Sequence, residues 1–259
     1  MMGIVQGLTE FIPVSSSGHL VIFPKLLGWE DSGLAFDTVL HMGTLLALLV
    51  YFSSDLKGFS VSFVKDLKKG FKSIESETRF LFWLILATLP AGLAGLLLEN
   101  FIESKFRSIL SVAVFLLLGS VLMYFADRKV GGKNLRPSLK NIFTVGLFQC
   151  LALFPGVSRS GATISGGLFV GFDRELAARI SFLLSIPVIA VAGLFQLPVA
   201  LLQFSGEDLG VLAAGFFSSA AAGYFSVYVL LKFLKKNSLR SFIIYRVVLG
   251  VFLILLHYS

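Results

Sequence analysis

The chain has 259 residues, of which 56% are hydrophobic and only 14% are charged. This composition and a mean hydropathy of +0.88 exclude an ordinary soluble domain and are typical of an integral membrane protein. The formal net charge is +7, and the single cysteine, Cys150, excludes disulfides and cysteine-based metal sites.

The first predicted element is a broken helix. Residues 3–18 read GIVQGLTEFIPVSSSG, an apolar run that is interrupted by Pro13 and then by a serine cluster. The run is too short to cross a bilayer, which takes about 20 apolar residues. No basic residues precede it, so it does not resemble a signal peptide. We expect the chain to begin inside a short first half-helix.

The same pattern returns at residues 146–161, which read GLFQCLALFPGVSRSG. Without gaps, 8 of the 16 positions are identical in the two copies. The copies differ at three polar positions: Glu10 stands opposite Leu153, Ser16 opposite Arg159 and His19 opposite Ala162. We therefore expect two broken helices that meet at one polar site inside a membrane protein.

Six further segments are apolar enough to span a membrane. They are approximately residues 36–52, 80–98, 108–125, 176–198, 210–234 and 242–258. The loops at 53–79, 126–140 and 235–241 carry six, five and three Lys or Arg residues, so the positive-inside rule places them in the cytoplasm. The positive charge thus indicates topology and no nucleic-acid partner. Within 53–79, apolar residues at helical spacing predict a helix that lies on the membrane surface.

These elements predict an all-α integral membrane protein with an inverted-topology repeat. Each half would hold one re-entrant helical hairpin and three transmembrane helices. The single membrane domain, 1–259, would divide into a first repeat at about 1–125, a cytoplasmic connector at 126–140 and a second repeat at about 141–259. Because an odd number of crossings inverts the second half, the two broken helices can converge near the bilayer midplane.

The breaks themselves predict an anion site. Pro13 and Pro155 end the first half-helix of each copy, because proline cannot continue the hydrogen-bond ladder. The serines that follow can then cap the next half-helix. Free N–H groups and the positive dipole ends of both half-helices would face the same space, which favours an anion.

Arg159 is the strongest candidate for binding that anion. A charge at mid-bilayer costs about 2.5–3.5 kcal/mol, and a guanidinium can clamp phosphate oxygens bidentately. The alternative is an ion pair with Glu10. Glu10 itself could bind a divalent cation, act as a general base or pair with Arg159. Gln6 lies one turn earlier on the same face, so Gln6 and Glu10 could hold Mg²⁺ or Ca²⁺ beside phosphate oxygens.

Ser16 and His19 are candidates for a nucleophile and its acid–base partner, because they lie three residues apart on one side of a helix start. The alternative is a capping serine and a packed histidine. Ser15 and Ser17 recur in the second copy, which favours a structural role for them.

Two further features carry weaker hypotheses. Asp37 and His41 have the spacing of a metal pair, but no third ligand lies nearby in sequence. Arg246 lies close to the basic loop at 235–241, so we expect its side chain to reach the headgroups.

Two long motifs carry a resemblance to a known family. QGLTEFIPVSSSGH at 6–19 and FQCLALFPGVSRSGATISGG at 148–167 resemble the signature regions of the bacterial undecaprenyl-diphosphate phosphatases, also called bacitracin-resistance proteins. The span order is similar over nearly the whole chain. The resemblance implies an enzyme of the bacterial cytoplasmic (inner) membrane whose active site faces the periplasm. It would hydrolyse undecaprenyl diphosphate to undecaprenyl phosphate, recycling the lipid carrier for cell-wall synthesis, with Mg²⁺ or Ca²⁺ as cofactor.

The same resemblance assigns roles to residues. Glu10 becomes an acid–base or metal-associated carboxylate, Ser16 the nucleophile, His19 an assisting acid or base, and Arg159 the diphosphate clamp. Further substrate contacts are expected from Gln6, Ser15, Ser17, Ser158, Ser160 and Thr163. Many members have Glu where this chain has Gln6, so Glu10 would have to do more here. The expected partners are the polyprenyl diphosphate substrate and membrane lipids, and a homodimer is one option for assembly.

Other functional classes remain as alternatives. A transporter or flippase of a phosphorylated lipid or anion would use the same midplane site, because broken helices in inverted repeats are typical of transporters. A non-catalytic partner of wall-synthesis enzymes is a third hypothesis. The histidine-nucleophile membrane phosphatases are excluded, because their signature needs His where this chain has Ser165.

Overall fold

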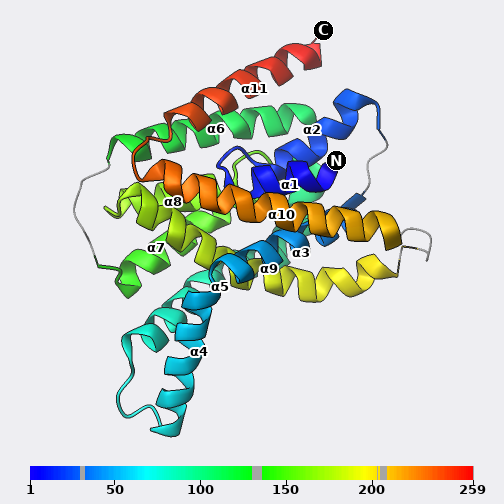
Figure 1. Ribbon diagram of the computed structural model, residues 1–259. Helices are drawn as coiled ribbons and strands as arrows, with labels where there is room; N and C mark the ends of the chain where they lie inside the picture. Colours follow the sequence, from blue (N-terminus) through cyan, green and yellow to red (C-terminus); the bar gives the residue numbers. More distant parts are fainter. Residues whose placement is uncertain (30–32, 130–135, 203, 205–208, 259) are drawn as a thin grey trace.

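The described part of the chain folds mainly into helices. The computed structural model describes residues 1–29, 33–129, 136–202, 204 and 209–258 (Figure 1). In chain order the elements are α1 (Met2–Phe11), α2 (Ser16–Leu27), α3 (Gly33–Tyr51), α4 (Ser53–Lys68), α5 (Ser76–Phe106), α6 (Ile109–Arg128), α7 (Leu139–Gln149), the 3-10 turn η1 (Cys150–Leu153), α8 (Arg159–Phe169), α9 (Arg174–Leu201), α10 (Leu209–Leu234) and α11 (Arg240–Tyr258). These ranges contain no strand, so the predicted all-α class is confirmed for them.

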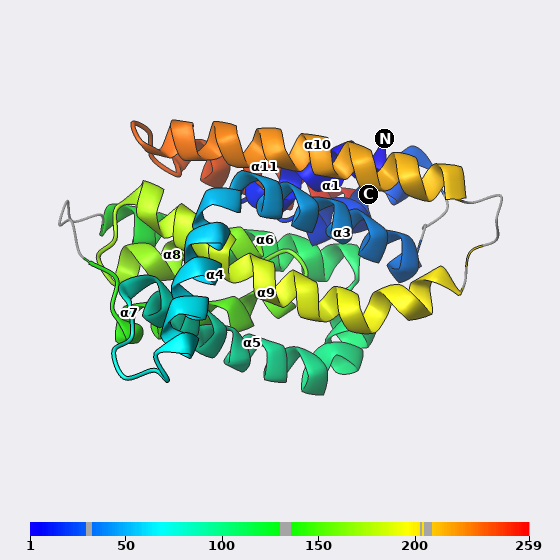
Figure 2. The same ribbon diagram turned by 60° about the horizontal axis from the view of Figure 1, so that its bottom comes forward.

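The long helices have the length and composition of membrane spans. Among the described residues, α5, α6, α9, α10 and α11 each qualify, and a sixth span results if α3 and α4 are one span bent by 72°. All six predicted segments therefore fall on helices. Figures 1 and 2 show α6, α9 and α10 running lengthwise through the molecule. The chain is a multi-pass membrane protein.

The basic segment after α3 contains a shorter helix than predicted. α4 ends at Lys68 and α5 already begins at Ser76, so the segment predicted as one helix forms two helices joined by a turn. The N–H of Glu75 donates to the carboxylate of Asp66 at 3.0 Å and closes this turn. Figure 1 shows α4 and the start of α5 projecting together from the body. Their location on the membrane surface stays a prediction.

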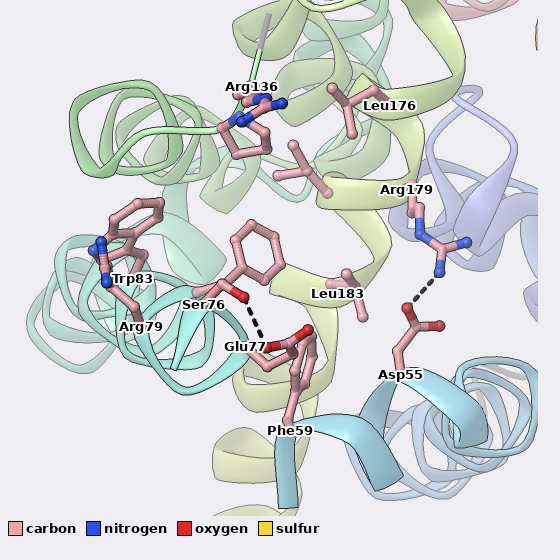
Figure 3. Close-up of a pocket in the computed structure, with 13 residues that line it drawn as sticks. Asp55, Phe59, Ser76, Glu77, Arg79, Trp83, Arg136, Leu176, Arg179 and Leu183 are labelled. Carbon is pink, nitrogen blue, oxygen red and sulfur yellow. Dashed lines mark hydrogen bonds and ion pairs between the residues drawn. The ribbon is translucent and has the colours of Figure 1, made fainter. Parts of the chain in front are cut away.

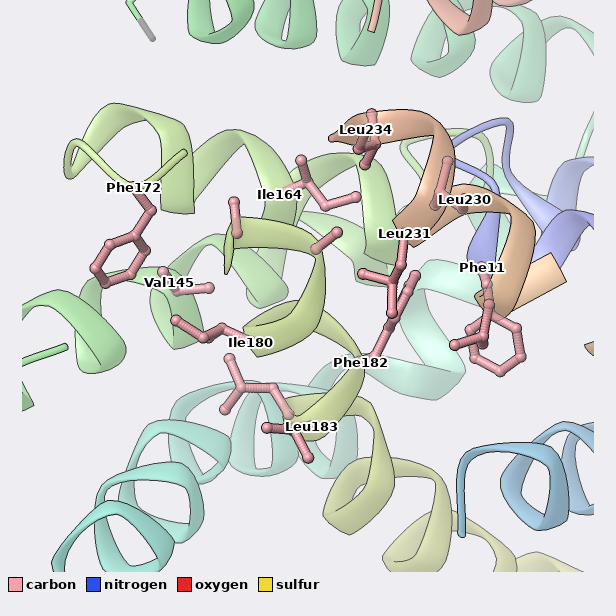
Figure 4. Close-up of a cluster of buried hydrophobic side chains, with 14 of the residues drawn as sticks. Phe11, Val145, Ile164, Phe172, Ile180, Phe182, Leu183, Leu230, Leu231 and Leu234 are labelled. Carbon is pink, nitrogen blue, oxygen red and sulfur yellow. The ribbon is translucent and has the colours of Figure 1, made fainter. Parts of the chain in front are cut away.

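A core of buried apolar side chains joins α1, α8, α9 and α10 (Figure 4). Phe182 of α9 packs edge-on against Phe11 at the end of α1, with ring centroids 5.4 Å apart. Ile164 of α8 and Leu230 of α10 belong to the same cluster. Because Phe11 is locked in this core, the preceding residue, Glu10, is held at a fixed place near the centre of the protein.

Small residues allow α1 to lie directly against α10. A Cβ atom added to Gly7 would lie only 2.5 Å from the carbonyl oxygen of Ser219 on α10. The hydroxyl of Ser219 donates to the carbonyl of Leu40 on α3 at 2.8 Å, which ties three helices together. Close approach through glycine and serine is how helices associate where lipid supplies no hydrophobic drive.

Gly7→Ala is expected to destabilise the protein. The added methyl forces α1 and α10 apart, and overpacking of this kind costs about 1–3 kcal/mol, or roughly 3–10 °C of thermal unfolding midpoint in detergent. Gly92→Ala is the matched control, because a Cβ on Gly92 of α5 meets nothing within 4 Å. Equal midpoints for the two variants would contradict the close packing of α1 on α10.

Candidate active site

Two breaks in the helices form the frame of the site. α1 ends at Phe11, before Pro13, and η1 ends at Leu153, before Pro155, as predicted. The next helices begin at Ser16 and Arg159, each behind a serine cap. The predicted break positions are therefore confirmed.

The caps have the same unusual geometry in both copies. Ser15 and Ser158 both have φ of 76°, a positive value that costs free energy for a residue with a side chain. Their hydroxyls accept the N–H of Gly18 at 3.3 Å and of Gly161 at 3.1 Å. The predicted capping role is confirmed for these two serines.

The caps leave backbone donors without partners. Among the described residues, the N–H groups at 15–17 and 158–160 have no hydrogen-bond partner in the protein. Unpaired N–H groups and the positive ends of the helix dipoles make such helix starts suitable for phosphate. The prediction of an anion-binding frame thus has a structural basis at both helix starts.

Glu10 connects the two copies. Its carboxylate is buried at the end of α1 and forms an ion pair with Arg159 at the start of α8. The hydroxyl of Ser16 donates to Glu10 Oε2 at 2.5 Å, and the amide of Gln6 donates to the same oxygen at 2.9 Å. The structure therefore brings together four of the predicted residues: Gln6, Glu10, Ser16 and Arg159.

His41 of α3 is a neighbour of Glu10 that the sequence did not assign to this site. Its Nε2 lies 3.6 Å from Glu10 Oε2, and its Nδ1 lies 2.8 Å from the carbonyl oxygen of Asp37. Nδ1 must carry a hydrogen to bond that carbonyl, so a second proton on Nε2 would make His41 a cation beside Glu10. Asp37, the other half of the predicted metal pair, lies 3.7 Å from Arg107 instead.

His19 and Ser16 have different hydrogen-bond partners. Its ring is buried, with Nδ1 at 2.7 Å from the carbonyl oxygen of Ser15 and Nε2 at 2.7 Å from the hydroxyl of Tyr245. Nδ1 donates to the carbonyl, so the hydroxyl of Tyr245 donates to Nε2. His19 thus stabilises the strained cap at Ser15 through the backbone carbonyl, whereas the Ser16 hydroxyl bonds to Glu10.

The remaining predicted contacts are hydroxyls on the two helix starts. Ser15 lies 3.3 Å from Ser17, and Ser158 lies 3.2 Å from Ser160, measured between their Oγ atoms. Thr163 is fully buried one turn into α8, where its hydroxyl lies 2.6 Å from that of Ser181 and donates to the carbonyl of Arg159 at 2.7 Å. In this arrangement Thr163 supports the backbone of Arg159.

Arg246 corrects an expectation. Its side chain was expected to reach the headgroups, but it is fully buried on α11. It donates to carbonyls of both breaks: Pro13 at 3.3 Å, Gly156 at 2.9 Å and Val157 at 2.9 Å. The reason is the rotation of α11, which turns Arg246 toward α6, where Ser120 accepts a further bond at 3.2 Å.

The side chains of Gln6 and Glu10 offer two candidate oxygen ligands for a metal ion. Among the described residues, no three His, Cys, Asp or Glu side chains form a group that could hold a metal ion. Gln6 Oε1, however, is buried without a hydrogen-bond partner, next to the Glu10 carboxylate. One carboxylate and one free amide oxygen suit Mg²⁺ or Ca²⁺ if phosphate oxygens and water complete the coordination.

Two pockets lie away from this site. The first has a volume of about 520 Å³ and lies between α4, α5 and α9, where Asp55 and Arg179 form an ion pair across it (Figure 3). The second has a volume of about 580 Å³ and also includes Arg179. Neither pocket is lined by Glu10, Ser16 or Arg159.

Comparison with known proteins gives one consistent result. The family model for the bacitracin resistance protein BacA matches residues 1–252. A protein of Methanosphaera stadtmanae named undecaprenyl-diphosphatase is 45% identical over 269 residues, covering 99% of this chain and 96% of its own length. Proteins with the same name from Hahella chejuensis and Geobacter sulfurreducens are 43% and 45% identical, each covering 96% of this chain and 94% of their own length. The chain belongs to the bacitracin resistance protein BacA family.

Proposed function

We propose that this membrane protein is an undecaprenyl-diphosphate phosphatase. It hydrolyses undecaprenyl diphosphate to undecaprenyl phosphate and inorganic phosphate, which recycles the lipid carrier for cell-wall synthesis. Bacitracin resistance would be a side effect of this reaction. The observation that carries the proposal is the Ser16 hydroxyl bonded to Glu10, which is paired with Arg159 between two helix starts. Family membership and the names of the relatives support the same reaction.

Arg159 is the group placed to bind the substrate. Its guanidinium can bond two phosphate oxygens at once, and the N–H groups at the starts of α2 and α8 add further donors. A diphosphate that takes over Arg159 also removes the cation from Glu10. Once Arg159 has turned to the diphosphate, the Glu10 carboxylate is free to accept the Ser16 proton or to bind a divalent cation.

Glu10 is the base that the geometry supports. In one route the Ser16 oxygen attacks the terminal phosphorus, its proton passes to Glu10, and the bond from that phosphorus to the bridging oxygen breaks, which releases undecaprenyl phosphate. Water then hydrolyses the phosphoserine, so that inorganic phosphate leaves and Ser16 regains a proton. In the other route Glu10 and Ser16 activate water for direct attack. Arg159 and the backbone donors stabilise the charge on the equatorial oxygens in both routes.

We assign a divalent cation to Gln6 and Glu10. The free Gln6 Oε1 and the Glu10 carboxylate would hold Mg²⁺ or Ca²⁺ together with substrate oxygens. When bound, the cation would neutralise phosphoryl charge. Chelation should then abolish turnover, and Gln6→Glu should lower the metal concentration needed for half-maximal activity, because it adds a second carboxylate.

Phosphate release tests the proposed reaction. Purified protein in detergent should release inorganic phosphate from undecaprenyl diphosphate in the presence of Mg²⁺ or Ca²⁺. No release by the folded wild-type protein would overturn the phosphatase proposal. If the same protein in proteoliposomes moves the lipid across the bilayer without releasing phosphate, the transporter alternative is correct.

We also propose the inverted repeat, with the boundaries given above. The two strained caps, Ser15 and Ser158, support it, as does the packing of α1 on α10 and of α7 on α5. Family membership supports a location in the inner membrane with the site open to the periplasm, and the positive-inside rule supports cytoplasmic loops at 53–79, 126–140 and 235–241. In a Cys150→Ser background, an impermeant maleimide should label Ser104→Cys in intact cells but not Ser60→Cys. The reverse labelling would contradict this orientation.

Variants of His19 separate a supporting role from acid–base chemistry. An asparagine can replace the Nδ1–H donor to the carbonyl of Ser15, so His19→Asn is expected to keep activity within about tenfold of wild type. His19→Ala, which releases the cap, should lose about 10²-fold or more in kcat. Equal loss in both variants would instead indicate that the imidazole transfers protons during the reaction.

A further inference from the structure

The second of the two pockets lies at the ends of three helices. It has a volume of about 580 Å³ and is lined by Tyr51 at the end of α3, Arg179 near the start of α9, and Tyr228 near the end of α10. Figures 1 and 2 show that α9 begins and α10 ends on the same side of the molecule. In a membrane protein, the level where spans end is the level of the lipid headgroups, and tyrosine is enriched there.

The lining of this pocket is strongly basic. The lining holds four cations, Arg179, Lys232, Lys235 and Lys236, and one carboxylate, Glu175, but Arg179 is already paired with Asp55 of α4. Glu175 neutralises only Lys235, at 3.1 Å. Lys232 lies over the ring of Tyr228 at 5.7 Å, which orients its ammonium group without cancelling its charge.

The alternative to a binding site is that these lysines stabilise the carboxyl end of α10 or keep this end of the protein on the cytoplasmic side of the membrane. Neither effect needs a pocket. The charges here come from α9 and the end of α10, and they surround a volume large enough for a headgroup, beside two tyrosines. Basic pockets between membrane helices at this level bind the headgroups of anionic lipids.

We propose that this pocket binds the phosphate headgroup of an anionic phospholipid, at a site separate from Glu10 and Arg159. Lys232 and Lys236 supply the charge that is not neutralised by Glu175, and Arg179 lies at the boundary with the neighbouring pocket of Figure 3. The acyl chains would extend along the outer faces of α9 and α10.

The test is lipid binding to delipidated, detergent-purified protein, measured by native mass spectrometry with phosphatidylglycerol. The double variant Lys232→Gln/Lys236→Gln is expected to bind phosphatidylglycerol about 10- to 30-fold more weakly, from the loss of two cations near the headgroup. The control Lys57→Gln/Lys68→Gln removes the same charge from α4, outside the pocket, and should change binding less than twofold. Phosphatidylcholine should bind weakly to all forms.

Three results would overturn the proposal. Equal loss of binding in the pocket and control variants would show a general effect of charge. Equal binding of phosphatidylcholine would show no preference for an anionic headgroup. Displacement of phosphatidylglycerol by millimolar inorganic phosphate would assign the pocket to a soluble anion. Phosphate release from undecaprenyl diphosphate in detergent is expected to be unchanged in both double variants, so that this proposal and the phosphatase proposal fail independently.

Discussion

Glu10→Gln is expected to lower kcat for phosphate release by about 10²- to 10⁴-fold, the range over which general bases contribute. The glutamine side chain has nearly the same size and can still meet Ser16, Gln6 and Arg159. It cannot accept a proton, and it leaves Arg159 without the anion that now faces it. Because the glutamine keeps the size of the side chain and its contacts with Ser16 and Gln6, stability should change less than activity. The measurement is single-turnover phosphate release, with thermal unfolding in detergent as the check on folding.

Arg159 gives the matching test from the second copy. Arg159→Lys keeps the charge but loses the planar group that bonds two oxygens, so KM should rise and kcat should fall. Arg159→Ala loses the charge as well, so KM should rise further and kcat should fall further. Full activity of Arg159→Ala at limiting substrate would contradict the clamp. Full activity of Glu10→Gln would contradict the base and leave only a structural ion pair.

The breaks in the helices could be predicted from sequence because their causes are local. A proline stops the hydrogen-bond ladder wherever it stands, and a serine that follows can cap the next helix. These rules predict half-helices that begin near Gly18 and Gly161, and α2 and α8 begin two residues earlier, at Ser16 and Arg159. The pairing of Glu10 with Arg159 was among the alternatives, because an inverted repeat can bring the first break, beside Glu10, close to the second break, beside Arg159.

The residues that support the site could not be predicted because their contacts join distant helices. His41 approaches Glu10 from α3, and Tyr245 reaches His19 from α11. Hydropathy predicts the length of a membrane span, but it does not predict the rotation of the helix about its axis, which decides which side chains face the interior of the protein. Arg246 shows the consequence: its distance from the helix end suggested the headgroups, whereas the rotation of α11 turns it into the protein.

Arg246 is expected to be the residue outside the immediate site with the largest effect. Its guanidinium bonds Pro13 in the first break and Gly156 and Val157 in the second, so one side chain fixes the two breaks relative to each other. These carbonyls point toward Arg246, and removing the donors leaves buried acceptors unpaired at about 1–3 kcal/mol each. Arg246→Met should therefore lower the thermal midpoint strongly and reduce kcat at least 10²-fold.

A steric variant separates this bridging role from a simple need for charge. A Cβ on Gly119 of α6 would lie 2.2 Å from Arg246 Nη2 and 2.8 Å from the carbonyl oxygen of Val157. Gly119→Ala thus keeps the guanidinium but displaces it from the carbonyls of the second break. The two serine caps that bind the transition state should then move apart. We therefore expect a larger fall in kcat than rise in KM. Arg246→Lys should lie between wild type and Arg246→Met, since an ammonium has fewer donors to share between the two breaks. If Gly119→Ala keeps wild-type kcat while Arg246→Met unfolds, Arg246 contributes stability alone and the alignment of the two breaks does not depend on it.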